Sequence, residues 1–120
     1  MATVNKSGFG YSQSLTVSAS TKTVDDTDCG LVQNITATCT ITLPATVVGY
    51  AYTFRVGAAG ITVNISPNAS DKIAGNGFTA TDNKDAIATT QPVGSILSLV
   101  GDGVNGYMVS EVRGTWTREA

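Results

Sequence analysis

The residues most suggestive of chemistry form a glycine-rich run near the C-terminus. Gly101-Asp-Gly-Val-Asn-Gly106 matches the GxGxxG pattern of dinucleotide-binding proteins. That chemistry requires a helix directly after the glycines, because the amides at its N-terminus hold the pyrophosphate. Residues 107–112 are strand-like instead. We therefore interpret the run as a hairpin turn and predict no cofactor.

Clustered carboxylates are the second candidate for chemistry. Asp25, Asp26 and Asp28 lie close together, and three more aspartates occupy the polar stretch 68–92. A Ca²⁺ ion takes about six to eight oxygen ligands, and the run matches no complete EF-hand loop. Aspartate is also favoured in turns for conformational reasons. We therefore predict turns and no metal site.

Catalysis has little support in the composition. The chain has no histidine, which is the usual base for a serine or cysteine nucleophile. A glycosidase needs two convergent carboxylates about 5 to 10 Å apart, whereas most of the acidic residues fall in predicted turns. Glu111 lies on a predicted strand beside Arg113, and we interpret the two as a surface or subunit-interface salt bridge. The sequence predicts that the protein is not an enzyme and has no catalytic residues.

The elements that position these residues are predicted to be β-strands. Thr38, Thr40 and Thr42 alternate with apolar neighbours, which puts the two sets on opposite faces of a strand. No segment has the 3.6-residue period of a helix. The segments expected to be extended are 15–20, 21–24, 31–37, 38–44, 50–57, 61–67, 95–100 and 107–117. We expect an all-β fold, a single antiparallel β-sandwich or jelly-roll-like domain over 23–120, with residues 1–22 as an N-terminal arm and first extended segment.

The low charge indicates a surface that is covered by other subunits. Charged residues make up 13% of the chain, about half the usual share, and such a surface suits a soluble monomer poorly. The net charge of −2 gives no basic patch for nucleic acid. No secretory signal or membrane span is present, so we predict cytosolic folding and no membrane partner. Cys29 and Cys39 are then expected to be reduced thiols, with a disulfide as the alternative.

Several short motifs occur in a fixed order between residues 23 and 117. They are an acidic turn with Asp28 and Gly30, ITLP at 41–44, G-x-x-Y-T-F at 49–54, P-N-A-S-D-K-I-x-G at 67–75, L-V-G-D-G at 99–103 and G-T-W at 114–116. This succession resembles a pattern of small tailed-bacteriophage virion proteins. Such chains occur as capsid decoration (cement) proteins and as tail-fibre or spike modules, and they are commonly trimeric. The resemblance implies a viral structural protein that forms a homotrimer.

Of these roles we expect capsid decoration, with a tail-fibre or tail-spike structural or receptor-binding module as the alternative and a different β binding module as the third possibility. The chain opens with Met1 and shows no heptads, collagen-like repeat or internal period. The expected partners are further copies of the chain and the major capsid protein of the phage head. The expected location is the capsid surface, after synthesis in the host bacterial cytoplasm.

The expected contact residues follow from this role. Phe9, Tyr11 and Leu15 are the large apolar residues of the arm after Met1, and we expect them to contact the capsid or a neighbouring subunit; a non-functional arm is the alternative. The expected trimer-interface residues are Thr38, Thr40, Thr42, Glu111 and Arg113. A threonine face can pack against a symmetry mate without burying a charge, although a solvated outer face has the same composition.

Overall fold

The described part of the chain is built from β-strands, which confirms the predicted all-β class. The computed structural model describes residues 14–120 except residues 76 and 79. Its strands are β1 (Ser14–Val17), β2 (Thr21–Thr23), β3 (Val32–Ile35), β4 (Cys39–Thr42), β5 (Ala51–Val56), β6 (Thr62–Ser66), β7 (Lys72–Ala74), β8 (Ala86–Thr89), β9 (Ile96–Gly101), β10 (Gly106–Arg113) and β11 (Thr117–Arg118). A short 3-10 helix, η1 (Asp26–Asp28), joins β2 to β3.

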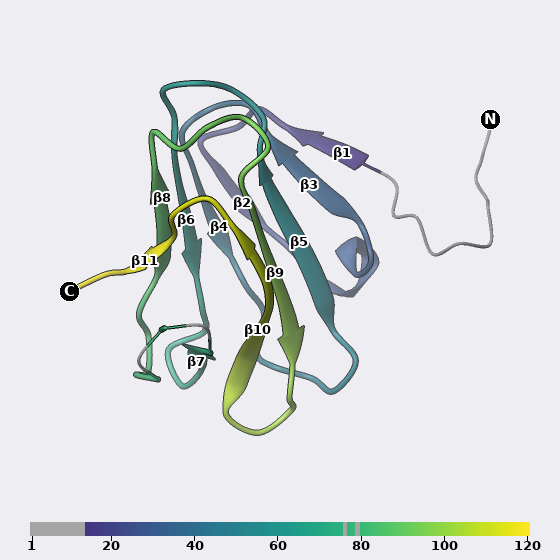
Figure 1. Ribbon diagram of the computed structural model, residues 1–120. Helices are drawn as coiled ribbons and strands as arrows, with labels where there is room; N and C mark the ends of the chain where they lie inside the picture. The colour runs from purple at the N-terminus through teal and green to yellow at the C-terminus, as the bar shows by residue number, and fades with distance from the viewer. Residues whose placement is uncertain (1–13, 76, 79) are drawn as a thin grey trace.

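The strands form two sheets that face each other as a sandwich (Figure 1). The six-stranded sheet has the order β1-β3-β5-β9-β10-β7, and the five-stranded sheet has the order β11-β8-β6-β4-β2. From β1 to β6 the chain alternates between the sheets, so that odd-numbered strands enter the first and even-numbered strands the second. The first half of the domain is therefore a coil whose successive turns lie side by side.

The expected antiparallel arrangement is wrong for this coil. Within it β1 pairs with β3, β3 with β5, β2 with β4 and β4 with β6, all in parallel. Antiparallel neighbours arise when a hairpin joins two strands of one sheet. Here each connection crosses to the opposite sheet, so the chain re-enters the first sheet in its original direction. Antiparallel pairing begins at β8 and β9, and the hairpin of β9 and β10 follows.

The turns of the coil differ in length, which explains why the sequence shows no internal period. In the six-stranded sheet Ser14 pairs with Val32 and Val32 with Thr53, so the second turn is longer than the first. The five-stranded sheet shows the same increase, since the step from Cys39 to Val63 exceeds that from Thr21 to Thr40. The length of the connection from the five-stranded to the six-stranded sheet is the same in both turns. It spans residues 24–31 between β2 and β3 and residues 43–50 between β4 and β5.

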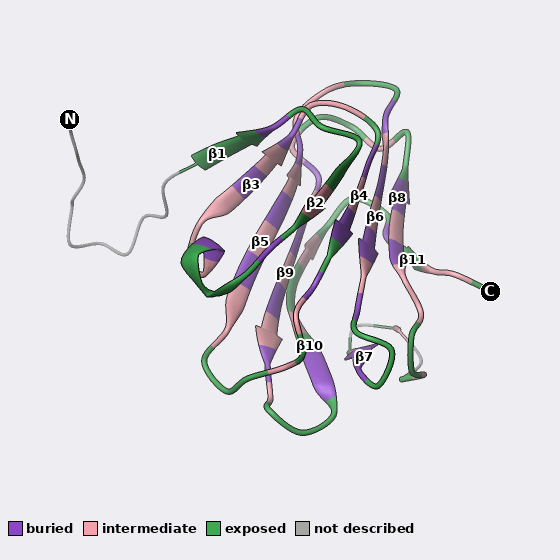
Figure 2. Cartoon of the chain, turned by 180° about the vertical axis from the view of Figure 1, so that it is seen from behind, coloured by how far each residue is buried: buried purple, intermediate pink, exposed green. Residues whose placement is uncertain are grey.

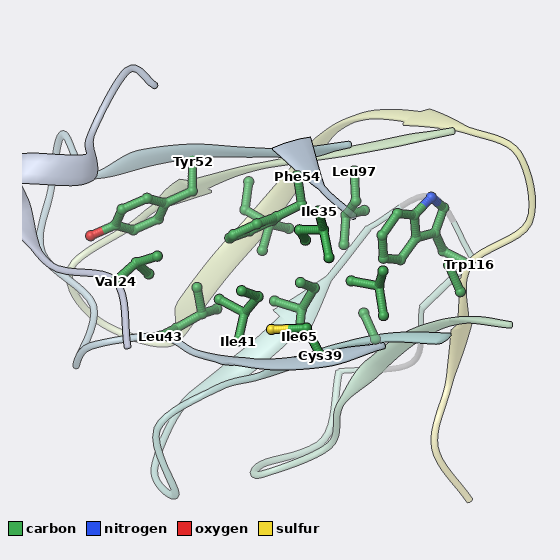
Figure 3. Packing of buried hydrophobic residues seen from close by; sticks show 14 of the residues in the cluster. Val24, Ile35, Cys39, Ile41, Leu43, Tyr52, Phe54, Ile65, Leu97 and Trp116 are labelled. Atoms are coloured by element: carbon green, nitrogen blue, oxygen red, sulfur yellow. The ribbon is translucent and has the colours of Figure 1, made fainter. Parts of the chain in front are cut away.

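The core lies between the sheets, where alternate residues of β3 to β9 are buried (Figure 2). Tyr52, Phe54 and Leu97 of the six-stranded sheet face Ile41 and Ile65 of the five-stranded sheet (Figure 3). Burial of each such side chain contributes about 1.5–3 kcal/mol. The predicted small core residue Cys39 is confirmed as buried, and it is a free thiol, as is Cys29. Burial raises the pKa of the Cys39 thiol, which keeps it protonated.

A polar cluster lies at the end of the sandwich beneath η1. Gln33 is fully buried, and its side-chain oxygen accepts a 2.8 Å hydrogen bond from Lys22 Nζ. Asp28 accepts from Lys22 Nζ at 3.2 Å, from Gln33 Nε2 at 3.3 Å and from the Asp25 amide at 3.1 Å. Each polar group of the cluster therefore finds a partner, as burial requires.

The sandwich begins earlier in the chain than the sequence indicated. The expected boundary between residues 22 and 23 falls inside β2, and β1 is already the first strand of the six-stranded sheet. Leu15 lies in β1 and is 40% exposed. Phe9 and Tyr11 lie outside the described residues, so their expected contacts stay predictions.

Candidate interaction surface

The glycine-rich run forms the turn of the β9–β10 hairpin, as the sequence predicted. Asp102 Oδ1 accepts hydrogen bonds from the amides of Val104, Asn105 and Gly106 at 2.8, 2.7 and 3.0 Å. These bonds, above all that from Gly106, hold the pKa of the Asp102 carboxyl below its ordinary value. The amides that a dinucleotide phosphate would need are thus occupied by a side chain of the turn itself.

Asp25 and Asp28 of the acidic run at 25–28 likewise accept hydrogen bonds from groups of the same domain. Asp25 Oδ1 accepts from the amide and the hydroxyl of Thr27 at 2.9 and 2.6 Å, which caps η1. Asp28 completes the polar cluster described above. Among the described residues, no group of three or more His, Cys, Asp and Glu side chains is placed to hold a metal ion. The carboxylates therefore act on backbone and side-chain partners of the same domain.

The predicted threonine strand is part of a larger surface, which we call the threonine face. Thr40 lies in register between Thr21 of β2 and Asn64 of β6, and Thr42 lies between Thr23 and Ser66. Its residues are Thr21, Thr23, Thr38, Thr40, Thr42, Thr62, Asn64, Ser66, Ile87, Thr89 and Thr117. None of these side chains is charged. Neighbouring strands of the sheet that carries them lie about 4.8 Å apart.

Asn64 has an unsatisfied acceptor near the middle of the threonine face. It lies in one row with Thr40 on one side and Ile87 on the other. Its Oδ1 atom is buried and accepts no hydrogen bond from the described residues. Such an unsatisfied acceptor costs about 1–3 kcal/mol. A donor supplied by a partner that covers this face would remove that cost.

The other two expected interface residues lie on the opposite side of the sandwich. Glu111 and Arg113 are on β10, in register with Ser98 and Ile96 of the six-stranded sheet. Arg113 Nε donates to Glu111 Oε2 at 2.9 Å, and both side chains are exposed. The structure therefore groups the three threonines on one face and the Glu111–Arg113 pair on the other. In a cyclic trimer each subunit contacts one neighbour with one patch and the other neighbour with a different patch. Residues on opposite faces can therefore belong to the same type of subunit contact.

An exposed apolar cluster at one end of the sandwich was not predicted. Val48 is 76% exposed in the β4–β5 connection, and Val104 is 80% exposed in the β9–β10 turn (Figure 1). The two segments touch, since a Cβ added to Gly103 would lie 2.6 Å from a Val48 methyl group. With the adjacent Val47 we call this cluster the valine tip. Valine in turns of otherwise polar composition is the sequence signal that could have indicated it.

A shallow depression of about 340 Å³ lies beside the valine tip. Ala74, Ala80, Tyr107 and Met108 supply much of its apolar wall. Of its charged residues, Lys72 pairs with Asp82 at 2.7 Å, and Asp102 binds the turn amides. The depression thus presents apolar surface and no charged group free for acid–base chemistry among its described lining residues.

Comparison with known proteins gives no relative. No protein-family model, curated protein or solved structure matches this chain. In the described part of the chain, no helix is long and apolar enough to cross a lipid bilayer. A function for the protein has therefore to be inferred from its own residues and surfaces.

Proposed function

We propose that this chain is a non-enzymatic structural protein that binds the outside of an assembled tailed-phage capsid as a homotrimer and stabilises it. The observation that carries this proposal is the threonine face, a broad uncharged surface across the five-stranded sheet. Such a surface can be covered by another protein without desolvating a charge. The motif succession between residues 23 and 117 supports the choice of a phage virion protein.

The trimer contact proposed here is between two different patches. The threonine face of one copy, centred on Thr38, Thr40 and Thr42, meets the outer face of β10 of the next, which carries Glu111 and Arg113. Threonine hydroxyls can both donate to the carboxylate and accept from the guanidinium, so the ion pair keeps its hydrogen bonds when covered. A stable contact of this kind buries about 800 Å² on each partner.

Attachment to the major capsid protein is assigned to the valine tip and Leu15. Two valines exposed to this degree on touching loops form a compact apolar projection, and such projections are typical of protein contacts. A protein that binds only the assembled shell adds its binding free energy to the stability of that state by mass action.

The test is a comparison of capsids with and without the protein. Capsids that lack it should assemble but rupture at a lower temperature or force, and adding the purified protein should restore the stability. Equal rupture temperatures for the two capsids would refute decoration. Labelling on the tail rather than the head would favour the alternative role.

A fibre or spike module is the second candidate, because no strand among the described residues pairs with the outer edge of β1 or of β2. Repeated parallel coils stack end to end in elongated proteins, and an open end permits further stacking. Immunogold labelling of whole virions distinguishes the two roles, since decoration places the protein over the head and a fibre places it at the tail.

A further inference from the structure

Two side chains on the outer face of the six-stranded sheet form a pair of hydrogen-bond donors. Asn34 of β3 and Arg55 of β5 are in direct register, and Arg55 Nη1 donates to Asn34 Oδ1 at 2.6 Å. Both side chains point outward, because Ile35 and Val56, which follow them, are buried in the core. Since its oxygen accepts from Arg55, the Asn34 carboxamide presents its NH2 group, and the guanidinium keeps further N–H donors. We call Asn34 and Arg55 the donor pair.

The sheet holds the donor pair in place. A Cβ atom added to Gly57 would lie 2.6 Å from Asn34 Oδ1, so the carboxamide occupies the space that a side chain at position 57 would fill. The Gly57 amide donates to the Ile35 carbonyl at 2.7 Å, which ties the two strands together just beyond the pair. The donor pair is therefore a positioned feature of this face.

Two carboxylates on the other side of the sandwich form a matching pair of acceptors beside the threonine face. The Glu119 amide donates to the Asp85 carbonyl at 2.9 Å, which places the two residues opposite each other where β11 meets β8. Asp85 is two residues before Ile87, and Glu119 is two residues after Thr117, so both lie on the same outer face as the threonines. Glu119 Oε1 also accepts from the Asp85 amide at 2.8 Å. We call Asp85 and Glu119 the acceptor pair.

Holding these two carboxyl groups next to each other is unfavourable in the single chain. Burial, and after it the neighbouring Glu119 carboxyl, raise the pKa of Asp85, against a hydrogen bond with Ser66 that lowers it. Like charges directly opposite each other on neighbouring strands destabilise a sheet. A cation placed over the acceptor pair would offset this repulsion, so the pair favours a positively charged partner.

The two pairs match in spacing. In each pair the members lie on neighbouring strands, about 4.8 Å apart. Beyond the donor pair, the next residues in register with Arg55 are Ile96 of β9 and Arg113 of β10. Beyond the acceptor pair, the next positions across the sheet are Ser66 of β6 and Thr42 of β4. When the donor pair is laid over the acceptor pair, Arg113 therefore comes over Thr42, in agreement with the trimer contact proposed above.

The two pairs belong to different copies in any such contact, because β3 and β5 lie in one sheet and β8 and β11 in the other (Figure 1). We propose that the donor pair of one copy binds the acceptor pair of the next, with Arg55 on Asp85 and Asn34 on Glu119. This inference rests on the homotrimer of the proposed function and assigns an ion pair to its contact. A contact between two different patches repeats at every interface of a closed ring.

Charge exchange in the full-length protein tests the contact. Arg55→Glu brings a carboxylate to the acceptor pair, and Asp85→Lys brings an ammonium group to Arg55. Each should raise the trimer dissociation constant roughly tenfold or more in analytical ultracentrifugation, because like charges brought together oppose a contact. The combined variant Arg55→Glu/Asp85→Lys has opposite charges at every interface and should regain most of the affinity. Asp26→Lys, at an exposed position of η1, is the control charge change.

Glu119→Gln separates loss of the contact from loss of the fold. Glutamine keeps an acceptor for the Asp85 amide but removes the negative charge beside Asp85. We expect the melting temperature of the dissociated chain to be unchanged or higher, while the trimer dissociation constant rises roughly threefold or more, because charged acceptors form the stronger hydrogen bonds. A fall in both stabilities would assign the effect to the fold and overturn the role of Glu119 in the contact.

These experiments distinguish failure of the contact from failure of the proposed function, because none of them uses a capsid. A trimeric wild type whose Arg55→Glu and Asp85→Lys variants stay equally trimeric would overturn the contact and leave capsid binding standing. So would a combined variant that regains no affinity. A wild type that is monomeric at micromolar concentration would overturn the trimer and the contact together.

Discussion

Thr46 joins the β4–β5 connection to the start of β10, because its hydroxyl donates to the Gly106 carbonyl at 2.6 Å across 60 residues of sequence. The same hydroxyl accepts from the Gly103 amide at 3.0 Å. The Thr46 amide donates to Asp71 Oδ2 at 2.8 Å, which brings in a third segment. One threonine therefore fixes the two loops that carry Val48 and Val104.

Removing that hydroxyl should destabilise the domain. Thr46→Val keeps the shape of the side chain but removes the acceptor of the Gly103 amide and leaves the Gly106 carbonyl with the Asp102 amide as its donor. We expect a loss of about 0.5–1.5 kcal/mol in the free energy of unfolding, measured by urea denaturation. The matched control is Thr115→Val, at an exposed position before β11. Equal stabilities of the two variants would show that Thr46 does not hold the loops together.

The valine tip should act in attachment and not in folding. Val48→Asp and Val104→Asp change exposed side chains, so we expect unfolding free energies within about 0.5 kcal/mol of the wild type. Their binding to capsids lacking the protein, measured by co-sedimentation, should weaken, because a carboxylate would have to be desolvated in the contact. Val93→Asp is the control, since Val93 is 52% exposed in the loop that precedes β9. A comparable loss of binding in Val93→Asp would contradict a specific role of the tip.

The polar cluster around Asp28 predicts a difference between two neighbouring aspartates. Asp28→Ala removes the acceptor of Lys22 Nζ, Gln33 Nε2 and the Asp25 amide, of which Gln33 is fully buried. We expect a loss of about 1–3 kcal/mol in unfolding free energy, from thermal or urea denaturation. Asp26→Ala, at an exposed position of the same 3-10 helix, should have little effect. Similar losses in both variants would assign the effect to η1 rather than to the cluster.

Local features of this fold could be predicted from the sequence, because they depend on neighbouring residues. The alternation around Thr40 correctly places Ile41 inward and the threonines outward, and the run ending at Gly106 is the predicted turn. Strand direction was not predictable, since it depends on which sheet each connection reaches and the turns of the coil have unequal lengths. The burial of Gln33 could not be predicted from the sequence either, because its hydrogen-bond partners Lys22 and Asp28 come from other segments of the chain.

The β9–β10 turn should contribute stability that depends on pH. Three backbone amides lower the pKa of Asp102 in the folded state. A lowered folded-state pKa stabilises the fold above the unfolded value, about 3.9, and this contribution is lost as the pH falls through the folded pKa. Asp102→Asn should therefore have a lower melting temperature than the wild type near neutral pH, and the difference should shrink below about pH 4. A difference that is constant across this range would contradict the assignment.

Two charge substitutions should reveal which faces form the trimer. Thr40→Lys places a long charged side chain in the middle of the threonine face, where covering it would desolvate the ammonium group and bring it close to Arg113 as well as Glu111 of the next copy. Glu111→Lys removes the partner of Arg113 and leaves two like charges on β10. If the faces meet as proposed, each variant alone should shift the protein from trimer to monomer in native mass spectrometry and light scattering. Thr115→Lys, in the exposed connection before β11, is the control and should leave the trimer intact. Dissociation by Glu111→Lys alone would place the interface on β10 without the threonine face, and a monomeric wild type at micromolar concentration would contradict the trimer itself.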